Sequence, residues 1–260
     1  MSRIITLLTD FGTADGYVGE MKGVLATGAA GASLVDVAHD LAPQDVNGAR
    51  LALARYWRKF PHGTVHLVVI DPGVGGDRAA LAVESEGRFL VGPDNGVLSP
   101  ALLHAGMRCV SLPVPRGASP TFHGRDVFAP AAANLAQGIA LDALGEPFGE
   151  PVIRRTPEAT RRDDGSVVGV VITLDRFGNA VTNLMARRGG VLVVGGRRLP
   201  LARAYGDVDT GSLVALVGSS GLVEIALRDG SAAAYLGLAR GSEVVLDAPP
   251  GPLSDSTRPR

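Results

Sequence analysis

The chain has 260 residues, of which 46% are hydrophobic and 20% charged, and its formal net charge is -1. This composition argues against disorder, and the length predicts either one large domain or two of ordinary size. Lys22 and Lys59 are the only lysines, so no basic stripe exists to follow a phosphate backbone, and we expect no nucleic-acid partner.

Cys109 is the only cysteine, which excludes an intrachain disulfide and a multi-cysteine metal site and predicts a small buried hydrophobe. No apolar run approaches the roughly 20 residues that a membrane-spanning helix needs. The apolar run at residues 4–8 is too short for a signal peptide, and Asp10 follows it closely. We therefore expect a cytoplasmic protein that contacts no membrane.

In the first half of the chain, predicted strands and helices alternate. Apolar runs predict buried strands at residues 4–9, 34–37, 65–70 and 88–91, and apolar residues at helical spacing predict helices at 17–27 and 46–60. This alternation implies a parallel sheet with right-handed crossovers. An edge strand is predicted at 110–114, because it contains Pro113, and a further helix at 127–137.

The amino-acid composition changes after residue 150, where prolines alternate with charged residues. We therefore predict a linker at 151–165. Short β-type runs follow at 167–174, 191–194, 213–217, 222–226 and 243–246, separated by glycine turns. The predicted fold is α/β. An N-terminal domain (1–150) holds a mostly parallel sheet flanked by helices, and a smaller all-β, barrel-like domain (166–247) follows. The proline- and serine-rich composition of residues 248–260 predicts a disordered tail.

Two predicted strands deliver an acid into a glycine-containing loop. The strand at 65–70 ends in Asp71, which a glycine-rich turn separates from Arg78, and the strand at 4–9 ends in Asp10. Open α/β sheets bind ligands just outside the carboxyl ends of their strands, so both acids are candidate site residues. The alternative is that Asp71 caps a tight turn and pairs with Arg78 on the surface.

His123 lies in a loop that enters the helix predicted at 127–137, beside polar neighbours. A lone histidine more often has a structural role than a catalytic one. In a loop beside polar residues, however, a functional role is comparably well supported. In the second half, Phe177 between Asp175 and Asn179 is a plausible base-binding element, because a ring stacks and an amide pairs with a base edge. The alternative is a hairpin loop with Phe177 tucked into the barrel.

The turn at 218–221, with Glu224 close behind it, offers small polar donors for a carboxylate or an amine, which is a weak indication by itself.

Seven motifs in order resemble one family. They are LLTDFG with DGYVGEMKGV, DVAHDLAPQDV, VVIDPGVGGDR, GPDNGVL, TFHGRDVFAPAAA, DRFGNAVTNL and GSSGLVEIA. The family is the S-adenosyl-L-methionine hydroxide adenosyltransferases, relatives of the bacterial fluorinase and chlorinase. The resemblance runs from about residue 4 to residue 245, nearly the whole chain.

The resemblance implies a homotrimer whose active site lies between the first domain of one subunit and the barrel domain of its neighbour. It also implies a catalytic triad that holds and activates water, with Asp71, Arg78 and His123 at the matching positions. The implied substrate is S-adenosyl-L-methionine, the products are adenosine and L-methionine, and no cofactor or metal is expected. The matching substrate-binding residues are Asp10 for the ribose hydroxyls, Phe177 and Asn179 for adenine, Asp175 and Ser219 near the methionine portion, and Asp15 and Glu224 without an assigned role.

Hydrolysis of S-adenosyl-L-methionine is the leading hypothesis, and two alternatives stay open. The first is halide-dependent adenosyl transfer, but the halogenating relatives carry aromatic residues at the positions of Asp71 and His123. They also carry an inserted loop that this sequence lacks between Arg78 and Gly92. The second is a nucleoside or S-adenosyl-L-methionine binding protein without useful turnover. The presence of all three triad residues argues against it, because a binding module needs no water-activating set.

Overall fold

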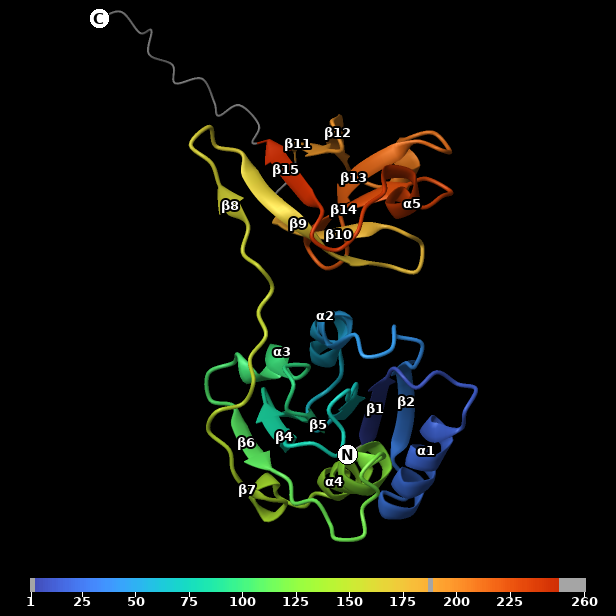
Figure 1. The fold of residues 1–260 in the computed structure, drawn as a ribbon, viewed down its shortest axis with the longest axis vertical. Coiled ribbons are helices and arrows are strands. Elements are labelled where there is room, and N and C mark those ends of the chain that lie inside the picture. The colour runs from blue at the N-terminus through green and yellow to red at the C-terminus, as the bar shows by residue number, and fades with distance from the viewer. Residues whose placement is uncertain (1–2, 187–188, 248–260) are drawn as a thin grey trace, which may run out of the picture. The chain divides into compact units, whose positions relative to one another are not determined.

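The computed structural model describes residues 3–186 and 189–247. Its internal contacts divide the chain into two compact units, Met1–Arg155 and Thr156–Arg260, which Figure 1 shows as ribbons. The tail predicted at 248–260 lies outside the described residues. Among the described helices, none combines the length and the apolar character that a membrane span requires.

The first unit is built on a seven-stranded mixed sheet. Its strand order is β2 (Ser33–Ala38), β1 (Ile4–Thr9), β3 (Val65–Val69), β5 (Arg88–Pro93), β4 (Ala80–Ser85), β6 (Arg108–Ser111) and β7 (Glu146–Pro147). The neighbours from β2 to β5 pair in parallel, as the alternating pattern predicts, whereas β4, β6 and β7 pair antiparallel. The sequence pattern does not predict β4. A tight turn at Glu86 and Gly87, both with positive φ, joins it to β5 and sets their antiparallel pairing.

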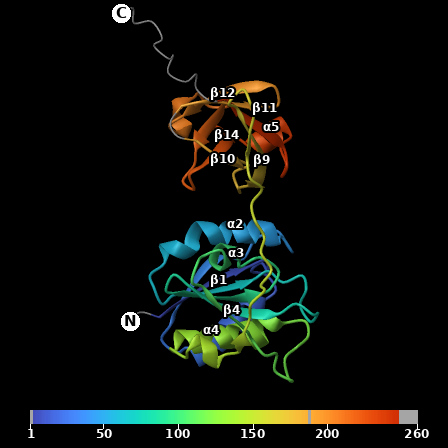
Figure 2. The same ribbon diagram turned by 90° about the vertical axis from the view of Figure 1, so that its left-hand side faces the viewer.

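Helices cover both faces of this sheet, as predicted. One face carries α1 (Tyr17–Gly28), the π-helical turn η2 (Gly124–Phe128) and α4 (Ala129–Ala136). The other carries α2 (Val46–Tyr56), η1 (Trp57–Lys59) and α3 (Ser99–Leu102), and Figure 2 shows α2 and α4 on opposite sides of the strands. The short η3 (Leu141–Ala143) precedes β7. Two buried apolar clusters, one on each side, hold the layers together.

The order of the parallel strands creates a switch point. From β1 the chain moves outward through α1 to β2, then returns through α2 to β3 on the other side of β1. The direction of winding therefore reverses between β1 and β3, and in open α/β sheets the crevice for a ligand lies outside the carboxyl ends of the strands at such a point.

The second unit is a closed barrel of seven strands, which confirms the predicted barrel-like fold. Around the barrel, the order is β10 (Ala180–Met185), β14 (Leu222–Leu227), β13 (Leu213–Val217), β12 (Arg197–Ala202), β11 (Val191–Val194), β15 (Glu243–Asp247) and β9 (Val167–Leu174), which pairs back to β10. Strand β8 (Thr160–Arg161) adds to β9. The short helices are η4 (Tyr205–Asp207) and α5 (Ala232–Leu236).

Most of the predicted strand bounds agree with the observed ones to within two residues. The predicted runs omit two long strands of the barrel. One is β10, and the other is β12, which begins with two arginines and contains a proline among its few apolar residues. It pairs in parallel with β13, whereas every other described pairing of the barrel is antiparallel.

Candidate active site

Asp10 and Asp71 leave the sheet at the same edge. Asp10 directly follows β1 and Asp71 lies two residues after β3, and the parallel register pairs Thr9 with Val69. The two carboxyl groups therefore flank the switch point between β1 and β3. His39, which directly follows β2, belongs to the same edge.

Asp71, Arg78 and His123 form one hydrogen-bonded chain. Arg78 Nε donates to Asp71 Oδ1 over 2.9 Å, and Arg78 Nη2 donates to Asp71 Oδ2. The same Nη2 lies 2.9 Å from His123 Nδ1. The side chains of Asp71 and Arg78 are only 5% and 10% exposed, so this pair is not the surface pair of the alternative interpretation.

The contact with Arg78 fixes the tautomer of His123. A guanidinium group only donates hydrogen bonds, so Nδ1 must accept, and the proton of the neutral ring lies on Nε2. Burial and the charge of Arg78 lower the pKa of His123, against the opposing influence of Asp71 and Asp126. The ring is therefore uncharged at neutral pH and presents an N–H donor.

Glycines bring the loop of Asp71 against the loop of His123. Gly75 has a φ of 75°, and a Cβ on it would lie 2.3 Å from the carbonyl oxygen of Pro120. The glycine-rich turn can thus pack directly on the segment that leads to His123. The guanidinium carbon of Arg78 also lies 5.2 Å from the ring centroid of Phe128, which supports the Arg78 side chain from the helix side.

The loop after β2 holds Asp10. The backbone N–H of Gln44, a residue with a φ of 64°, donates to Asp10 Oδ2 over 2.6 Å. The N–H of Gly12 donates to the carbonyl oxygen of His39 over 2.8 Å. The His39 ring is buried, with Nδ1 2.8 Å from Thr9 Oγ1.

The other ring nitrogen of His39, Nε2, lies 3.0 Å from Asp36 Oδ1. Sequence reasoning missed His39 and Gln44, although both lie in the DVAHDLAPQDV motif.

Three aromatic rings connect the loops of Asp10 and His123. Phe11, Tyr17 and Phe122 lie with their ring centroids 5.4 to 5.8 Å apart in each pair. Asp15 is exposed in the turn before α1, and it does not join the hydrogen-bonded chain of Arg78.

In the barrel unit, Asp175 organises the loop between β9 and β10. Its Oδ1 accepts hydrogen bonds from the backbone N–H groups of Phe177 and Asn179, each over 2.9 Å. Its Oδ2 accepts from Asn179 Nδ2, also over 2.9 Å. Phe177 is 77% exposed, so its ring is not tucked into the barrel, whereas Asn179 is buried.

Ser219 and Glu224 lie along the neighbouring hairpin. Ser219 is exposed in the turn between β13 and β14, and Glu224 is a buried residue of β14. The hydroxyl of Tyr205 donates to Glu224 Oε1, a contact that sequence reasoning missed. The predicted residues thus fall into two sets. The first unit carries Asp10, Asp15, Asp71, Arg78 and His123, and the barrel unit carries Asp175, Phe177, Asn179, Ser219 and Glu224.

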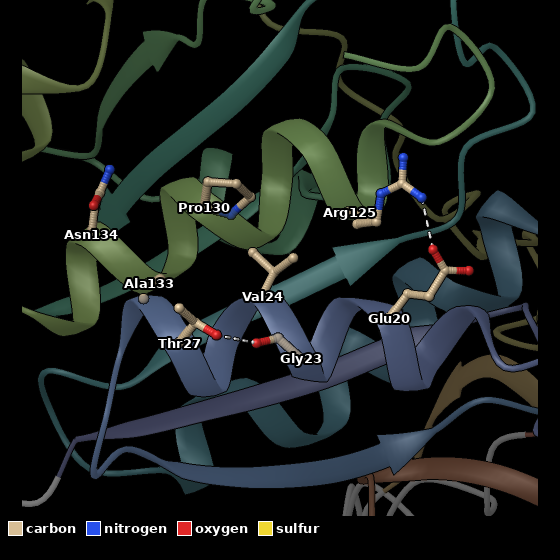
Figure 3. A pocket seen from close by; sticks show the side chains of 9 residues that line it. Glu20, Gly23, Val24, Thr27, Arg125, Pro130, Ala133 and Asn134 are labelled. Carbon is tan, nitrogen blue, oxygen red and sulfur yellow. Dashed lines mark hydrogen bonds and ion pairs between the residues drawn. The ribbon is translucent and has the colours of Figure 1, made fainter. Parts of the chain in front are cut away.

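A separate groove of about 570 Å³ lies between α1 and α4. Figure 3 shows Arg125 and Glu20 joined at one end of it by an ion pair of 2.7 Å. None of the predicted site residues lines this groove. Within residues 3–186 and 189–247, no group of three or more His, Cys, Asp or Glu side chains is arranged to hold a metal ion.

Both units match known family profiles. The profile of the SAM hydroxide adenosyltransferase N-terminal domain matches residues 5–145, and that of the C-terminal domain matches residues 169–245. The (R)-S-adenosyl-L-methionine hydrolase of Thermus thermophilus is 45% identical over 94% of this chain and 99% of its own length. The enzyme of the same name from Salinispora arenicola is 39% identical over 94% of this chain and 97% of its own length.

A crystal structure of an uncharacterized conserved protein from Thermotoga maritima superimposes with a TM-score of 0.85. It is 32% identical in sequence and covers 94% of this chain and 100% of that one. Fluorinases also match this chain, at the lower identities of 27% to 29%.

Proposed function

Because the chain belongs to the SAM hydroxide adenosyltransferase family, we propose that it hydrolyses S-adenosyl-L-methionine to adenosine and L-methionine. It is an S-adenosyl-L-methionine hydrolase, since relatives of that name are 38% to 45% identical and fluorinases are more distant. The observation that carries the mechanism is the buried chain from Asp71 through Arg78 to His123 at the switch point of the sheet.

The chemistry needs a positioned oxygen nucleophile and little else. A water oxygen attacks the ribose 5′ carbon in line with the sulfur, and the carbon–sulfur bond breaks with its electron pair going to sulfur. The cationic sulfonium becomes the neutral thioether of methionine, so the leaving group needs neither a proton nor a metal ion. The main tasks of the protein are therefore to orient one water molecule and to accept its proton.

We assign acceptance of that proton to Asp71. Arg78 grips both carboxyl oxygens, which fixes their direction, and each oxygen keeps a second lone pair for water. His123 acts as a donor, because its Nδ1 is occupied by Arg78 and its Nε2 carries the proton. In this arrangement, the Nε2–H orients the water oxygen and leaves Asp71 as the base.

The same carboxylate disfavours a halide nucleophile. A negative charge 4 Å from a halide ion costs about 4 kcal/mol at an effective dielectric constant of 20, whereas water suffers no such repulsion. The segment between Arg78 and Gly92 consists of β4, the tight turn at Glu86 and Gly87, and β5. It therefore lacks the inserted loop of the halogenating relatives, which further supports hydrolysis.

The substrate contacts are proposed from both units. Asp10 binds the ribose hydroxyls, Phe177 stacks on adenine, and Asn179 pairs with its edge. Because the site residues are divided between the two units, we propose a homotrimer in which the first unit of one subunit and the barrel of its neighbour complete each site. The 77% exposure of Phe177 supports this, since so large an exposed ring calls for a partner.

The names of the relatives also indicate the (R)-epimer of the sulfonium, and we propose it as the substrate here. No metal cofactor is proposed, and a cytoplasmic location stays a prediction from the sequence.

Hydrolysis is tested by incubating the protein with each sulfonium epimer in water labelled with oxygen-18 and high chloride, then analysing products by mass spectrometry. We expect adenosine that carries one oxygen-18 atom, formed faster from the (R)-epimer and unaffected by a chelator. Production of 5′-chloroadenosine as the main product would favour halide transfer. Binding without any product over prolonged incubation would favour a binding protein.

A further inference from the structure

We propose that Asn95 is a positioning residue for the reaction, because its side chain fixes the segment that carries Asp71 and Arg78. That segment, residues 70–79, joins β3 to β4, and we call it the catalytic turn. The inference rests on the proposed function, since it concerns how the same site is assembled. Asn95 belongs to the GPDNGVL motif and takes part in none of the proposed catalytic or substrate contacts.

The catalytic turn crosses the end of β5. It leaves β3 and enters β4, and the sheet order places β5 between these two strands. Strand β5 runs parallel to β3 and antiparallel to β4, and Pro93 at its end pairs with Ala80 at the start of β4. The turn spans two strand spacings, about 10 Å in total. Its two ends therefore meet Asp94 and Asn95, which directly follow β5, at one edge of the sheet.

The side chain of Asn95 holds the start of the turn. Its Nδ2 donates to the carbonyl oxygen of Ile70 over 2.8 Å, and Ile70 directly precedes Asp71. The register between β3 and β5 ends with the pair of Leu67 and Val91, so this bond extends the connection between the two strands to the residue beside the proposed base. A shift of the Ile70 peptide group would move Asp71 with it.

An amide is the side chain that this position requires. The carbonyl oxygen of Ile70 needs a donor, whereas the backbone N–H of Val97, 3.1 Å from Asn95 Oδ1, needs an acceptor. The two ends of one amide satisfy both groups, and together the two bonds fix the orientation of the side chain. A carboxylate of the same size could accept from Val97 but would repel the carbonyl oxygen of Ile70.

The other end of the turn is held by the backbone. The N–H of Asp94 donates to the carbonyl oxygen of Ala79 over 2.9 Å, and Ala79 directly follows Arg78. This bond continues the antiparallel ladder of β4 and β5, so it does not depend on the type of side chain. The bond from Asn95, in contrast, can be removed by a single substitution that leaves the ladder in place.

The ion pair transmits a shift of the turn to the rest of the triad. Within the turn, the contact of the Asp71 backbone is local, since its carbonyl oxygen accepts the N–H of Val74 over 3.2 Å. The carboxylate of Asp71 binds Arg78 through both of its oxygens, and Nη2 of Arg78 also contacts His123. A displaced Asp71 therefore takes the guanidinium group away from the imidazole.

The first test is Asn95→Ala, which removes the amide and adds no charge. We expect kcat to fall about 10- to 100-fold and KM to stay within about threefold of wild type, because the turn orients water and does not hold the nucleoside. The titration of His123 is followed by NMR without substrate. Its pKa should rise towards about 6.5, since Arg78 moves away from the ring and water enters.

The second test is Asn95→Asp, which keeps the size of the side chain and the acceptor for Val97 but replaces the donor by an oxygen atom. Its kcat should fall at least as far as that of Asn95→Ala. Because this variant has the size of wild type, it carries the kinetic test if Asn95→Ala fails to fold.

Ser99→Ala is the matched control. The hydroxyl group of buried Ser99 donates to the carbonyl oxygen of Gly96 over 2.6 Å and accepts the N–H of Arg154 over 2.8 Å. The substitution therefore removes two hydrogen bonds of the segment that contains Asn95 without touching the catalytic turn. We expect the kcat and the His123 titration of wild type, whatever the thermal stability of this variant.

Three results would overturn the inference. They are a kcat within about threefold of wild type in the residue 95 variants, an unchanged His123 titration in Asn95→Ala, and an equal loss of kcat in Ser99→Ala. The last would show that destabilising the segment is sufficient. Failure of the proposed function would appear separately, as a wild-type protein that forms no adenosine, and the His123 titration would still decide whether Asn95 holds the turn.

Discussion

Nη2 of Arg78 lies 2.9 Å from Nδ1 of His123 and also donates to Asp71. One nitrogen thus connects the two other members of the triad and dictates that the imidazole accepts at Nδ1. In the proposed mechanism, the carboxylate of Asp71 therefore accepts a proton from water, and the neutral ring of His123 donates one hydrogen bond to it.

The titration of His123 should depend on Arg78. Burial and the guanidinium charge lower the pKa of His123, so in the wild-type protein the ring should titrate below its usual value of about 6.5. In Arg78→Met the guanidinium charge is gone while Asp71 remains, so the pKa should rise. NMR of the ring carbons over a pH series measures this, and the wild-type protein serves as the reference. An unshifted His123 curve in Arg78→Met would contradict the proposed contact.

Asp71→Asn should lower kcat by roughly 100-fold or more, because an amide holds water but cannot accept its proton. KM should change little, since Asp71 acts on the nucleophile and not on the bound nucleoside. Asp77→Asn is the matched control, an exposed acid in the same turn, and should retain wild-type rates. Full activity in Asp71→Asn would refute the assignment of the base.

Gly75→Ala should damage the site without touching any polar residue. An alanine there must adopt a φ of 75° and place its Cβ against the carbonyl of Pro120, which separates the loops of Arg78 and His123. The backbone strain alone costs about 1–2 kcal/mol. A displacement of about 1 Å can lower kcat by as much as 100-fold. Kinetics and thermal unfolding measure both effects, and Gly117→Ala, in open space with an ordinary φ, should show neither.

His66 should make the fold sensitive to acid. It lies on the central strand β3, and its fully buried ring packs against the rings of Tyr56, Trp57 and Phe60. Burial, with help from Arg88, lowers the pKa of His66 to about 4. In the unfolded chain its pKa is near 6.5. Between pH 4 and pH 6.5, His66 is therefore protonated in the unfolded state and neutral in the folded state. The contribution of neutral His66 to the free energy of unfolding should therefore be complete above pH 6.5. The free energy of unfolding should fall by about 3 kcal/mol as the pH drops towards 4.

Urea unfolding at a series of pH values measures this dependence. His66→Gln should flatten the part of the curve that His66 causes, whatever its effect on stability at pH 7. His62→Gln, at an exposed position, should keep the wild-type slope. An equal slope in all three proteins would exclude His66 as the source.

The proposed trimer predicts complementation between defective subunits. Asp71→Asn removes the base in the first unit, and Asn179→Ala removes the adenine contact in the barrel. If each site takes one unit from each of two subunits, co-expressed mixtures should recover activity that neither variant has alone. Light scattering should give a mass of about 80 kDa, three times that of the 26.7 kDa chain. A fully active monomer would refute the trimer.

Local sequence patterns were sufficient to predict the elements whose cause is local. Strands such as β1 and β3 are continuous apolar runs because both faces of the sheet are covered, and such runs are visible without the fold. The acids that follow these two strands were predictable for the same reason, since the carboxyl ends of parallel strands share one edge. The motif order was enough to indicate the family.

Contacts between residues distant in the chain could not be predicted in this way, because they depend on how the elements pack. Arg78 and His123 are 45 residues apart, and the tautomer of the ring follows from a hydrogen bond that neither local sequence encodes. The antiparallel half of the sheet was equally hidden, because β4 gains its place by pairing with β5 and β6. Glu224 is the clearest case. Its burial beneath Tyr205 and against Gly218 depends on which face of β14 points away from the barrel core, and this is set by packing and register across three strands.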